Sequence, residues 1–328
     1  MKAMLLAAGE GQRLRPLTEF VPKPALPFLN IPLAYYSTEL LLSIGIKDFV
    51  VNTYHLSSVI RSTFESQRSK FQGLNFSDEK SLMGSGGGIG EARNHLAGSG
   101  DFFVMNADEV IFPHDIDFLI KMRGQHQKSG AIATLMVKDH PGVGKEFGGV
   151  WAQSNYEVDM FSKINPGKSH LKGWHFIGPM ILSDRVFKYI PQGQVSNIFY
   201  DCLTHAMNDG EKVIAFKTEC DWFETGNSQD FLSATEACLK SNSAPLKNFI
   251  YSMWSRYAPE MQLFKTNEAI VLAEKLPVGS STKGFVVLGR NCEIPSGSVL
   301  ENCIIANGMS FSSKKEIKNQ IIVDSSQL

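Results

Sequence analysis

The N-terminal segment, residues 1–8, constrains the fold more than any other part of the sequence. It is almost entirely apolar and ends at Gly9, where a glycine-rich, basic loop begins. Such a run is typical of a strand that is buried on both faces of a parallel sheet. Ligands of open parallel sheets bind beyond the carboxyl ends of the strands, so we expect the loop 9–15 to lie at the functional edge.

Strand-like and helix-like segments alternate after this first strand. We predict helices over 33–44, 59–67 and 118–128, and strands over 49–52, 102–106 and 131–137. This alternation predicts an α/β fold with a Rossmann-like, mostly parallel sheet and helices on both faces. Asp108 follows one of these strands and is therefore expected at the same edge as the glycine loop.

The pattern changes beyond residue 240. Residues 241–280 indicate a helical linker, and 281–328 contain short apolar triplets separated by Gly, Asn, Pro and Ser. A spacing of about six residues between triplets is typical of a left-handed β-helix. We therefore predict three parts, 1–240, 241–280 and 281–328. Because about two or three turns are few for a free-standing solenoid, the last part should pack on the first or mediate a homo-oligomer.

Charge and cysteine content exclude several classes of protein. The net charge is −1 over 328 residues, so the whole chain offers no field that would attract nucleic acid or an anionic membrane. No stretch approaches the roughly 20 apolar residues that a membrane span needs. The five cysteines are odd in number and widely spaced, without a CxxC pair. They indicate reduced thiols in a cytoplasmic protein, not disulfides or a zinc site.

The loop after the first strand has the chemistry of a phosphate site. Gly9 and Gly11 allow the backbone N–H groups to approach a phosphate closely. Arg13 supplies a planar fork of donors, and Lys23 is held between two prolines. The generic fingerprints fail here, because there is no P-loop motif and Leu14 occupies the third glycine position of GxGxxG.

The segment from Leu5 to Thr18, followed by Pro22–Leu26, resembles the signature of the sugar-1-phosphate nucleotidyltransferases, G-x-G-x-R-x-x-P-L-T and then P-K-P. The resemblance implies that this loop wraps a nucleoside triphosphate. It also implies that the arginine and the lysine bind the reacting phosphates. The residues that it assigns to the nucleotide and its phosphates are Ala7, Ala8, Gly9, Gly11, Arg13 and Lys23.

Two further segments follow in the order of that family. Gly84–Ile89 resembles its base-recognition turn, which assigns Gly86 and Gly87 to the nucleobase, although a lone glycine-rich turn is more often a flexible loop. The tetrapeptide ending in Asp108 resembles the family's N-x-D motif. The resemblance implies that Asp108 coordinates Mg²⁺ beside the substrate residue Asn106; a helix cap is the alternative for such an aspartate.

The sugar side departs from the family pattern. Lys163 matches the lysine of the family's E-K-P motif, which the resemblance places on the sugar phosphate, but Ser162 replaces the glutamate. A surface lysine is the alternative. Gly149 and Gly178 are expected to bring backbone close to the sugar, with a plain β-turn as the alternative for the segment around Gly149.

Residues 221–227 resemble the family's W-x-D-x-G-T segment, whose aspartate is the second metal ligand. Glu224 stands at that position, with one additional methylene. Mg²⁺ requires near-octahedral geometry at short distances, so this carboxylate must retract or bind through water. Asp221 is a nearby substitute. The departure leaves two possibilities, an adjusted active site or a weakened one.

The resemblance therefore implies a Mg²⁺-dependent transfer in which a sugar-1-phosphate attacks a nucleoside triphosphate and pyrophosphate leaves. The glycine-rich turn is most similar to uridylyltransferases of N-acetylmuramic acid-1-phosphate, whereas the C-terminal turns favour mannose or glucose enzymes, and we favour UTP. A catalytically silent subunit that binds nucleotide-sugars is the alternative. An acyltransferase built on the β-helix is disfavoured, because no histidine occurs from Lys283 onward.

Overall fold

The computed structural model describes residues 1–327, which pack into two compact units. The first unit contains three stretches of chain, Met1–Gly9, Ser37–Glu109 and Asp115–Cys220. The second unit contains Glu10–Tyr36, Val110–His114 and the chain from Asp221 onward. Each unit is therefore assembled from segments far apart in the sequence, and each is described separately below.

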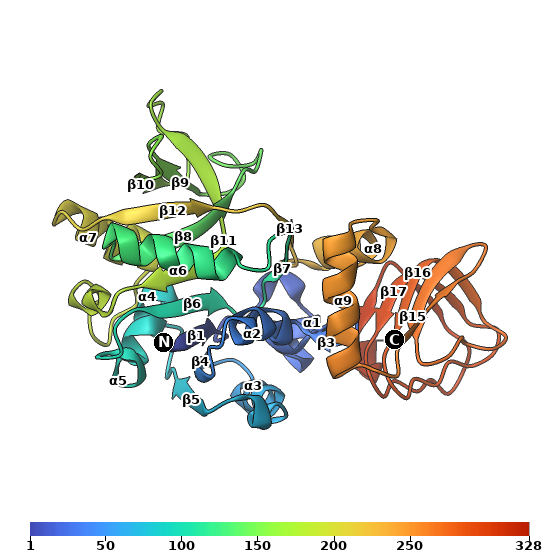
Figure 1. Ribbon diagram of the computed structural model, residues 1–328. Helices are drawn as coiled ribbons and strands as arrows, with labels where there is room; N and C mark the ends of the chain where they lie inside the picture. The colour runs from blue at the N-terminus through green and yellow to red at the C-terminus, as the bar shows by residue number, and fades with distance from the viewer. Residues whose placement is uncertain (328) are drawn as a thin grey trace. The chain divides into compact units, whose positions relative to one another are not determined.

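A nine-stranded mixed sheet forms the centre of the first unit (Figure 1). Its parallel part has the order β6-β1-β4-β5, with the predicted first strand reduced to β1 (Ala3–Leu6). The long strand β11 (Lys172–Leu182) runs antiparallel to β6, and from there the sheet is mixed. The other strands are β4 (Asp48–Thr53), β5 (Gly73–Asp78), β6 (Phe102–Asn106), β8 (Ala133–Lys138), β9 (Gly149–Ala152), β10 (Val158–Ser162) and β12 (Val213–Lys217).

Both faces of the parallel part are buried, which explains its continuous apolar sequence. Met4 and Val104 join one core cluster on one face of the sheet. Their chain neighbours Leu5 and Phe103 point to the other face and are also fully buried, at 0% exposure. The prediction of an α/β fold is confirmed, but the sheet is mixed, because β11 returns antiparallel next to β6.

The three predicted helices match observed helices within two residues at each end. The predicted segments 33–44 and 118–128 are α2 (Leu33–Ser43) and α6 (Phe118–Ser129), and α6 lies along β8 and β12 in Figure 1. The segment 59–67 begins two residues earlier, as α3 (Ser57–Glu65). The first unit also contains α4 (Gly84–Glu91), α5 (Arg93–Leu96), α7 (Thr204–Asn208), the 3₁₀-helices η3 (Arg68–Lys70) and η4 (Asp184–Lys188), and a π-helix, η5 (Ile198–Leu203).

Edge-to-face aromatic contacts hold the separate pieces of the second unit together. The Phe112 ring lies 6.1 Å from Tyr36 and 5.5 Å from Phe249, and Phe28 lies 5.5 Å from Phe231. These contacts join the chain around residues 28–36 to residue 112 and to two helices. The rings belong to α2, β2 (Pro27–Phe28), β7 (Val110–Pro113), α8 (Ser228–Lys240) and α9 (Ala244–Tyr257). The second unit also contains α1 (Leu17–Phe20), β3 (Ile31–Pro32) and β13 (Cys220–Phe223).

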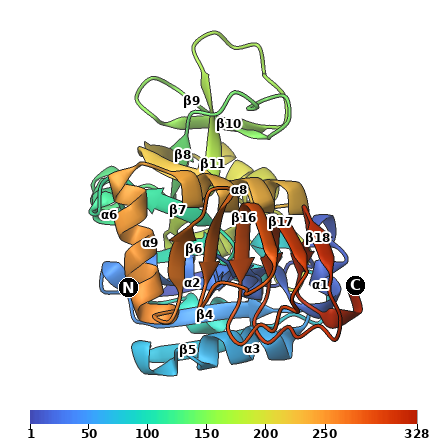
Figure 2. The same cartoon turned by 90° about the vertical axis from the view of Figure 1, so that its right-hand side faces the viewer.

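A second sheet occupies the C-terminal part of the chain, and Figure 2 shows its strands β16, β17 and β18 side by side. From β16 onward, neighbouring strands pair in parallel with an offset of 17 or 18 residues, as in Val286 with Cys303 and Ile304 with Ile321. Before them, β15 pairs in parallel with β16 at an offset of 15 residues, and β14 pairs antiparallel with β15. The strands are β14 (Gln262–Lys265), β15 (Ala269–Ala273), β16 (Ser281–Leu288), β17 (Val299–Ile305), β18 (Glu316–Lys318) and β19 (Ile321–Ile322). Within the segment 241–280, predicted as a helical linker, a helix covers Ala244–Tyr257, whereas β14 and β15 belong to this sheet.

Asparagines at equivalent positions mark the repeat. Asn302 and Asn319 both have positive φ, +46° and +51°, a conformation that asparagine adopts more readily than most residues. The Asn302 side chain donates to Asn319 Oδ1 at 3.2 Å and accepts from the Phe285 N–H at 3.3 Å.

Among residues 1–327, no helix has the length and apolar character of a membrane span.

Candidate functional site

The loop after β1 enters the second unit at Glu10, and its conformation depends on Gly11. Gly11 has φ +62°, and a Cβ there would lie 2.8 Å from Thr18 Cγ2 and 3.4 Å from Lys23 Cβ. The Thr18 hydroxyl donates to the Gly11 carbonyl at 3.0 Å. Glycine is therefore required at this position, and it brings the loop against Lys23. At Gly9, by contrast, a Cβ would meet nothing within 4 Å.

Arg13 and Glu224 face each other within the second unit. Arg13 Nη2 lies 3.7 Å from Glu224 Oε1, and the arginine side chain remains 69% exposed. A Cβ on Gly226 would lie 2.2 Å from Glu224 Oε1 and 2.4 Å from Arg13 Nη2. The missing side chain of Gly226 thus gives these two groups the space in which they meet. A cation assigned to phosphates and a carboxylate assigned to metal are neighbours here.

At the end of β1, in the first unit, the backbone is held by a buried hydrogen-bonded chain. The Ala7 N–H donates to Asn52 Oδ1 at 2.7 Å, and Asn52 Nδ2 donates to Glu79 Oε1 at 2.6 Å. The other Glu79 oxygen accepts from the Met83 N–H at 2.9 Å. Burial raises the pKa of the Glu79 carboxyl, while these two hydrogen bonds lower it. Asn52 and Glu79 therefore fix the backbone from which the glycine loop departs.

The predicted base-recognition turn is a helix, α4, which begins at Gly84. The N–H groups of Gly86 and Gly87 donate to the Ser196 carbonyl at 2.9 and 3.3 Å. A Cβ on Gly86 would lie 2.7 Å from Ser196 Oγ and 2.9 Å from Cys202 Sγ. The prediction of a turn was wrong because the glycines allow close packing of a helix against 194–202. Recognition of a base by these residues stays a prediction, and it would require groups other than these two N–H groups.

Asn106 and Gly178 come together around Glu109, a residue that sequence reasoning missed. The Asn106 amide donates to Glu109 Oε1 at 2.8 Å. Gly178 has φ +109°, and a Cβ there would lie 2.5 Å from Glu109 Cγ. Asp108 belongs to the same short segment after β6. The spacing N-x-x-E after a predicted strand was the available signal for Glu109.

Lys163 and Gly149 lie in the region of β9 and β10, next to Tyr200. The Lys163 ammonium is 6.0 Å from the centroid of the Tyr200 ring. A Cβ on Gly148 would lie 2.6 Å from Tyr200 Oη, and one on Gly149 would lie 2.7 Å from Trp151 Nε1. Tyr200 belongs to the π-helix η5, a type of helix that often occurs at functional sites. The sequence offered no signal for Tyr200, because π-helices have no simple spacing pattern.

The predicted site residues are divided between the two units. Gly11, Arg13, Lys23 and Glu224 belong to the second unit. Those of the first unit are Ala7, Ala8, Gly9, Gly86, Gly87, Asn106, Asp108, Gly149, Lys163 and Gly178. Within the units, the structure pairs Arg13 with Glu224, places Asn106 and Gly178 against Glu109, and places Gly11 against Lys23.

The chemistry of the donors is compatible with Mg²⁺. Within residues 1–327, no group of three or more His, Cys, Asp or Glu side chains forms a metal-binding cluster. Mg²⁺ is commonly held by only one or two carboxylates, with water and substrate phosphates completing the shell. Asp108 and Glu224 are hard oxygen donors of this kind, and the Glu224 side chain is 28% exposed. Their chemistry therefore fits this ion.

Comparison with known proteins identifies the family. The family described as Nucleotidyl transferase matches residues 2–241 of this chain. The match includes the glycine loop, the segment around Asp108 and the segment around Glu224. The chain therefore belongs to the nucleotidyl transferase family.

The individual relatives have low sequence identity to this chain, but they align with most of its length. The UTP–glucose-1-phosphate uridylyltransferase of Synechocystis sp. is 26% identical over 93% of this chain and 82% of its own length. The mannose-1-phosphate guanylyltransferase catalytic subunit beta of Xenopus tropicalis is 27% identical over 74% of this chain, which spans 65% of that relative. A UDP-glucose pyrophosphorylase structure from Acinetobacter baumanii has a TM-score of 0.61 at 18% identity, over 78% of this chain and 99% of that one. This last similarity concerns the fold alone.

Proposed function

We propose that this chain forms a nucleoside diphosphate sugar and pyrophosphate from a nucleoside triphosphate and a sugar-1-phosphate. The observation that carries the proposal is the glycine loop of a nucleotidyl transferase, with Arg13 beside Glu224. A cation for phosphates and a carboxylate for metal, 3.7 Å apart, suit a reaction between two anions. The names of the relatives, a uridylyltransferase and guanylyltransferases of hexose-1-phosphates, support the same class of reaction.

In the proposed reaction, an oxygen of the sugar-1-phosphate forms a bond to the α-phosphorus, and the bond from that phosphorus to the pyrophosphate oxygen breaks. Arg13 and Lys23 hold the triphosphate and reduce the repulsion between the two anions. Lys163 orients the attacking phosphate. No general base is needed, because that phosphate is already ionised near neutral pH. Catalysis then consists of positioning and electrostatic stabilisation.

Asp108 and Glu224 would hold the magnesium ion that the family resemblance implies. Once bound, the ion would neutralise phosphate oxygens and help to align them. For Glu224, the ion pair with Arg13 has a consequence in the free enzyme. The arginine is held on a carboxylate until phosphate or metal competes for one of the two partners.

We propose UTP as the preferred nucleotide and leave glucose-, mannose- and N-acetylmuramic acid-1-phosphate as acceptors to be tested. We also propose that the C-terminal sheet is a short left-handed β-helix, supported by its parallel strands from β16 to β19, which are offset by 17 or 18 residues. On this basis 1–240 is the nucleotidyltransferase domain, and the last part is the candidate surface for a homo-oligomer.

The experiment that tests the activity is pyrophosphate release by purified protein. UTP, GTP, dTTP, CTP and ATP are each combined with the sugar-1-phosphates above and with N-acetylglucosamine-1-phosphate, with and without Mg²⁺. We expect one productive pair that depends on Mg²⁺ and is lost in Asp108→Ala. Release from every pair without metal dependence would contradict the proposal.

A silent subunit that binds nucleotide-sugars is the second candidate. The observation in its favour is that Glu224 replaces aspartate and already pairs with Arg13. This candidate predicts no pyrophosphate release from any pair, together with a rise in Tm when a nucleotide-sugar is added. The same panel therefore separates the two candidates.

A further inference from the structure

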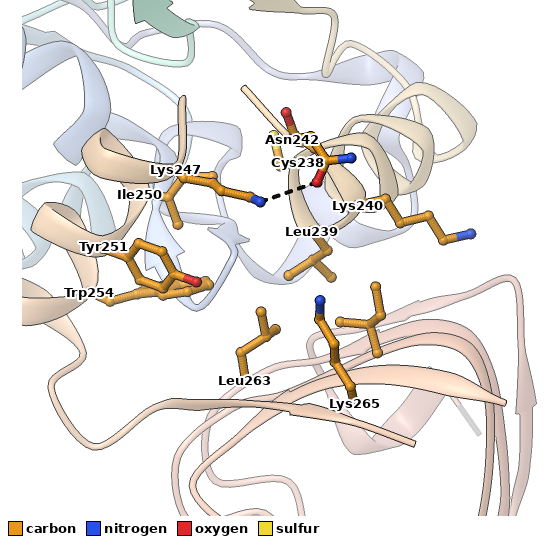
Figure 3. Close-up of a pocket in the computed structure, with 12 residues that line it drawn as sticks. Cys238, Leu239, Lys240, Asn242, Lys247, Ile250, Tyr251, Trp254, Leu263 and Lys265 are labelled. Carbon is orange, nitrogen blue, oxygen red and sulfur yellow. Dashed lines mark hydrogen bonds between the residues drawn. The ribbon is translucent and has the colours of Figure 1, made fainter. Parts of the chain in front are cut away.

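A hollow in the second unit is lined by none of the residues assigned above to nucleotide, sugar or metal. It lies between the C-terminal end of α8, one side of α9 and the strands β14 and β15 (Figure 3). Its volume is about 160 Å³. A site of this size accommodates a small molecule rather than a segment of chain.

One wall of the hollow is apolar and aromatic. Tyr251 is 51% exposed, an unusually open position for a large aromatic side chain, and its ring lies 5.5 Å from that of Trp254. The Trp254 indole N–H donates to the Leu29 carbonyl at 2.9 Å, so its polar edge is already satisfied. Ile250 and Leu263 contribute further apolar surface. This wall suits the ring or hydrocarbon part of a ligand.

Lysines supply the charge of the hollow. In Figure 3 the ammonium groups of Lys247 and Lys265 point toward the hollow from opposite sides, one from α9 and one from β14. Lys247 donates to a neutral partner, Asn242 Oδ1, at 3.3 Å. Lys240 points away and pairs with Glu236 at 2.5 Å. Among the described residues that line the hollow, none is Asp or Glu. The lining therefore carries uncompensated positive charge.

We propose that this hollow binds a small organic phosphate, with the phosphate between Lys247 and Lys265 and an apolar ring against Tyr251 and Trp254. Two ammonium groups on opposite sides attract an anion and donate hydrogen bonds to its oxygens. The aromatic wall selects a phosphate that carries an apolar group over inorganic phosphate. This proposal does not depend on the proposed catalytic activity.

The test is calorimetric titration of the full chain with phenyl phosphate, inorganic phosphate and benzyl alcohol. Phenyl phosphate is expected to bind more tightly than either of the other two, which each carry only one of its two groups. The double variant K247Q/K265Q should weaken phenyl phosphate about tenfold or more, since charge-assisted hydrogen bonds are lost. Tyr251→Ala should reduce the preference for phenyl phosphate over inorganic phosphate. Lys283→Gln, an exposed lysine of β16, is the matched control and should bind as wild type does.

Two further results would overturn the proposal. Phenyl phosphate binding that K247Q/K265Q leaves unchanged would show that the lysines do not hold the phosphate. Binding that disappears in Arg13→Ala but survives in K247Q/K265Q would assign the phosphate to the glycine loop instead. Thermal unfolding of each variant shows whether it is folded. Loss of binding is interpreted only for variants whose thermal unfolding transition matches that of the wild type.

Discussion

Glu224 is the residue at which the chain departs most consequentially from its family's pattern. The additional methylene extends its carboxylate, and the carboxylate lies 3.7 Å from the Arg13 guanidinium. An exposed ion pair of this kind contributes only about 0–1 kcal/mol to stability. The ion pair therefore matters because it fixes the positions of the guanidinium and the carboxylate. The absence of a side chain at Gly226 provides the space for this pair.

Substitution of Glu224 distinguishes two roles for this residue, a ligand of the metal or only an ion-pair partner of Arg13. Glu224→Ala removes both roles and should lower kcat by about a hundredfold, the scale of losing one preorganised electrostatic group. Glu224→Asp keeps a carboxylate but shortens its reach toward Arg13. We expect it to retain Mg²⁺-dependent turnover and to change the KM for the triphosphate. Steady-state kinetics across Mg²⁺ concentrations make the comparison, with Glu219→Ala as the exposed control. Wild-type kcat in Glu224→Ala would exclude it as a metal ligand.

Asn52 is a positioning residue, because it acts on the loop through the Ala7 N–H. Asn52→Ala would remove the hydrogen bonds that this N–H and one Glu79 oxygen make with the Asn52 amide. The expected cost in unfolding free energy is about 1–3 kcal/mol, the penalty for unsatisfied buried polar groups. We also expect a higher KM for the triphosphate than for the sugar phosphate. A purely structural role would change stability without this split in KM.

The matched control for Asn52→Ala is Asn75→Ala. Asn75 lies on the neighbouring strand β5 and is exposed. Denaturant unfolding and steady-state kinetics measure both variants. If Asn75→Ala raises the KM for the triphosphate as much as Asn52→Ala does, the buried chain of hydrogen bonds is not the cause.

At the scale of elements, the helix α4 shows how a glycine run can serve packing. Its glycines allow the segment 194–202 to approach so closely that the Ser196 carbonyl accepts from two consecutive N–H groups. Gly88 similarly leaves room for Glu79 and Asn52, whose atoms would lie 2.6 and 2.9 Å from a Cβ. The glycine pattern therefore has a structural reason in this chain, whatever it does for a base.

Two glycine-to-alanine substitutions test that packing. Gly86→Ala would place a methyl group 2.7 Å from Ser196 Oγ and should destabilise the fold by about 1–3 kcal/mol through overpacking. Gly124→Ala, inside α6, meets nothing within 4 Å and should stabilise by about 0.5–1 kcal/mol through helix propensity. Denaturant unfolding measures both. Equal effects of the two substitutions would contradict the packing explanation.

The sequence predicted elements well where periodicity is local. The strand at 102–106 matches β6 residue for residue, and the helices α2 and α6 end within one residue of their predicted positions. Prediction failed where contacts with segments distant in the sequence determine the local structure. The sequence Gly84–Ile89 does not indicate that the Ser196 carbonyl accepts hydrogen bonds from N–H groups of this segment. The sequence 262–273 likewise does not indicate that one of its strands pairs in parallel with β16. Propensity cannot detect contacts across a hundred residues.

The candidate site was predictable where an ordered motif exists and not where side chains act through others. The glycine loop predicted Arg13 and Lys23, and the family match covers both. Asn52, Glu79 and Tyr200 escaped prediction because their roles come from tertiary contacts at 2.6–2.7 Å or from a π-helix. Sequence motifs thus identify the residues expected to contact substrate. The residues that support them are identified only from the three-dimensional structure.

At the scale of the whole molecule, stability is expected to depend on pH through two histidines, the buried His126 and the half-buried His175. Burial first, and then His140 and Lys138, lower the pKa of His175 from 6.5 to about 4. Burial also lowers the pKa of His126. Both side chains are therefore less easily protonated in the folded chain than in the unfolded one. The unfolded chain then binds more protons between the two pKa values, and acid shifts the equilibrium toward it.

The sign of this effect gives the last prediction. For His175, the stabilising contribution is complete above pH 6.5, decreases as the pH falls from 6.5 to about 4, and changes no further below that. We expect Tm to fall across this window. His175→Phe keeps an aromatic ring beside Phe147, 4.8 Å away, and removes the proton site. Its Tm should therefore fall less steeply between pH 6.5 and 4 than that of the wild type. Because the raised pKa of Glu79 opposes the loss, only the difference between the two curves reports on His175. Parallel curves would show that His175 does not contribute to the acid sensitivity of the fold.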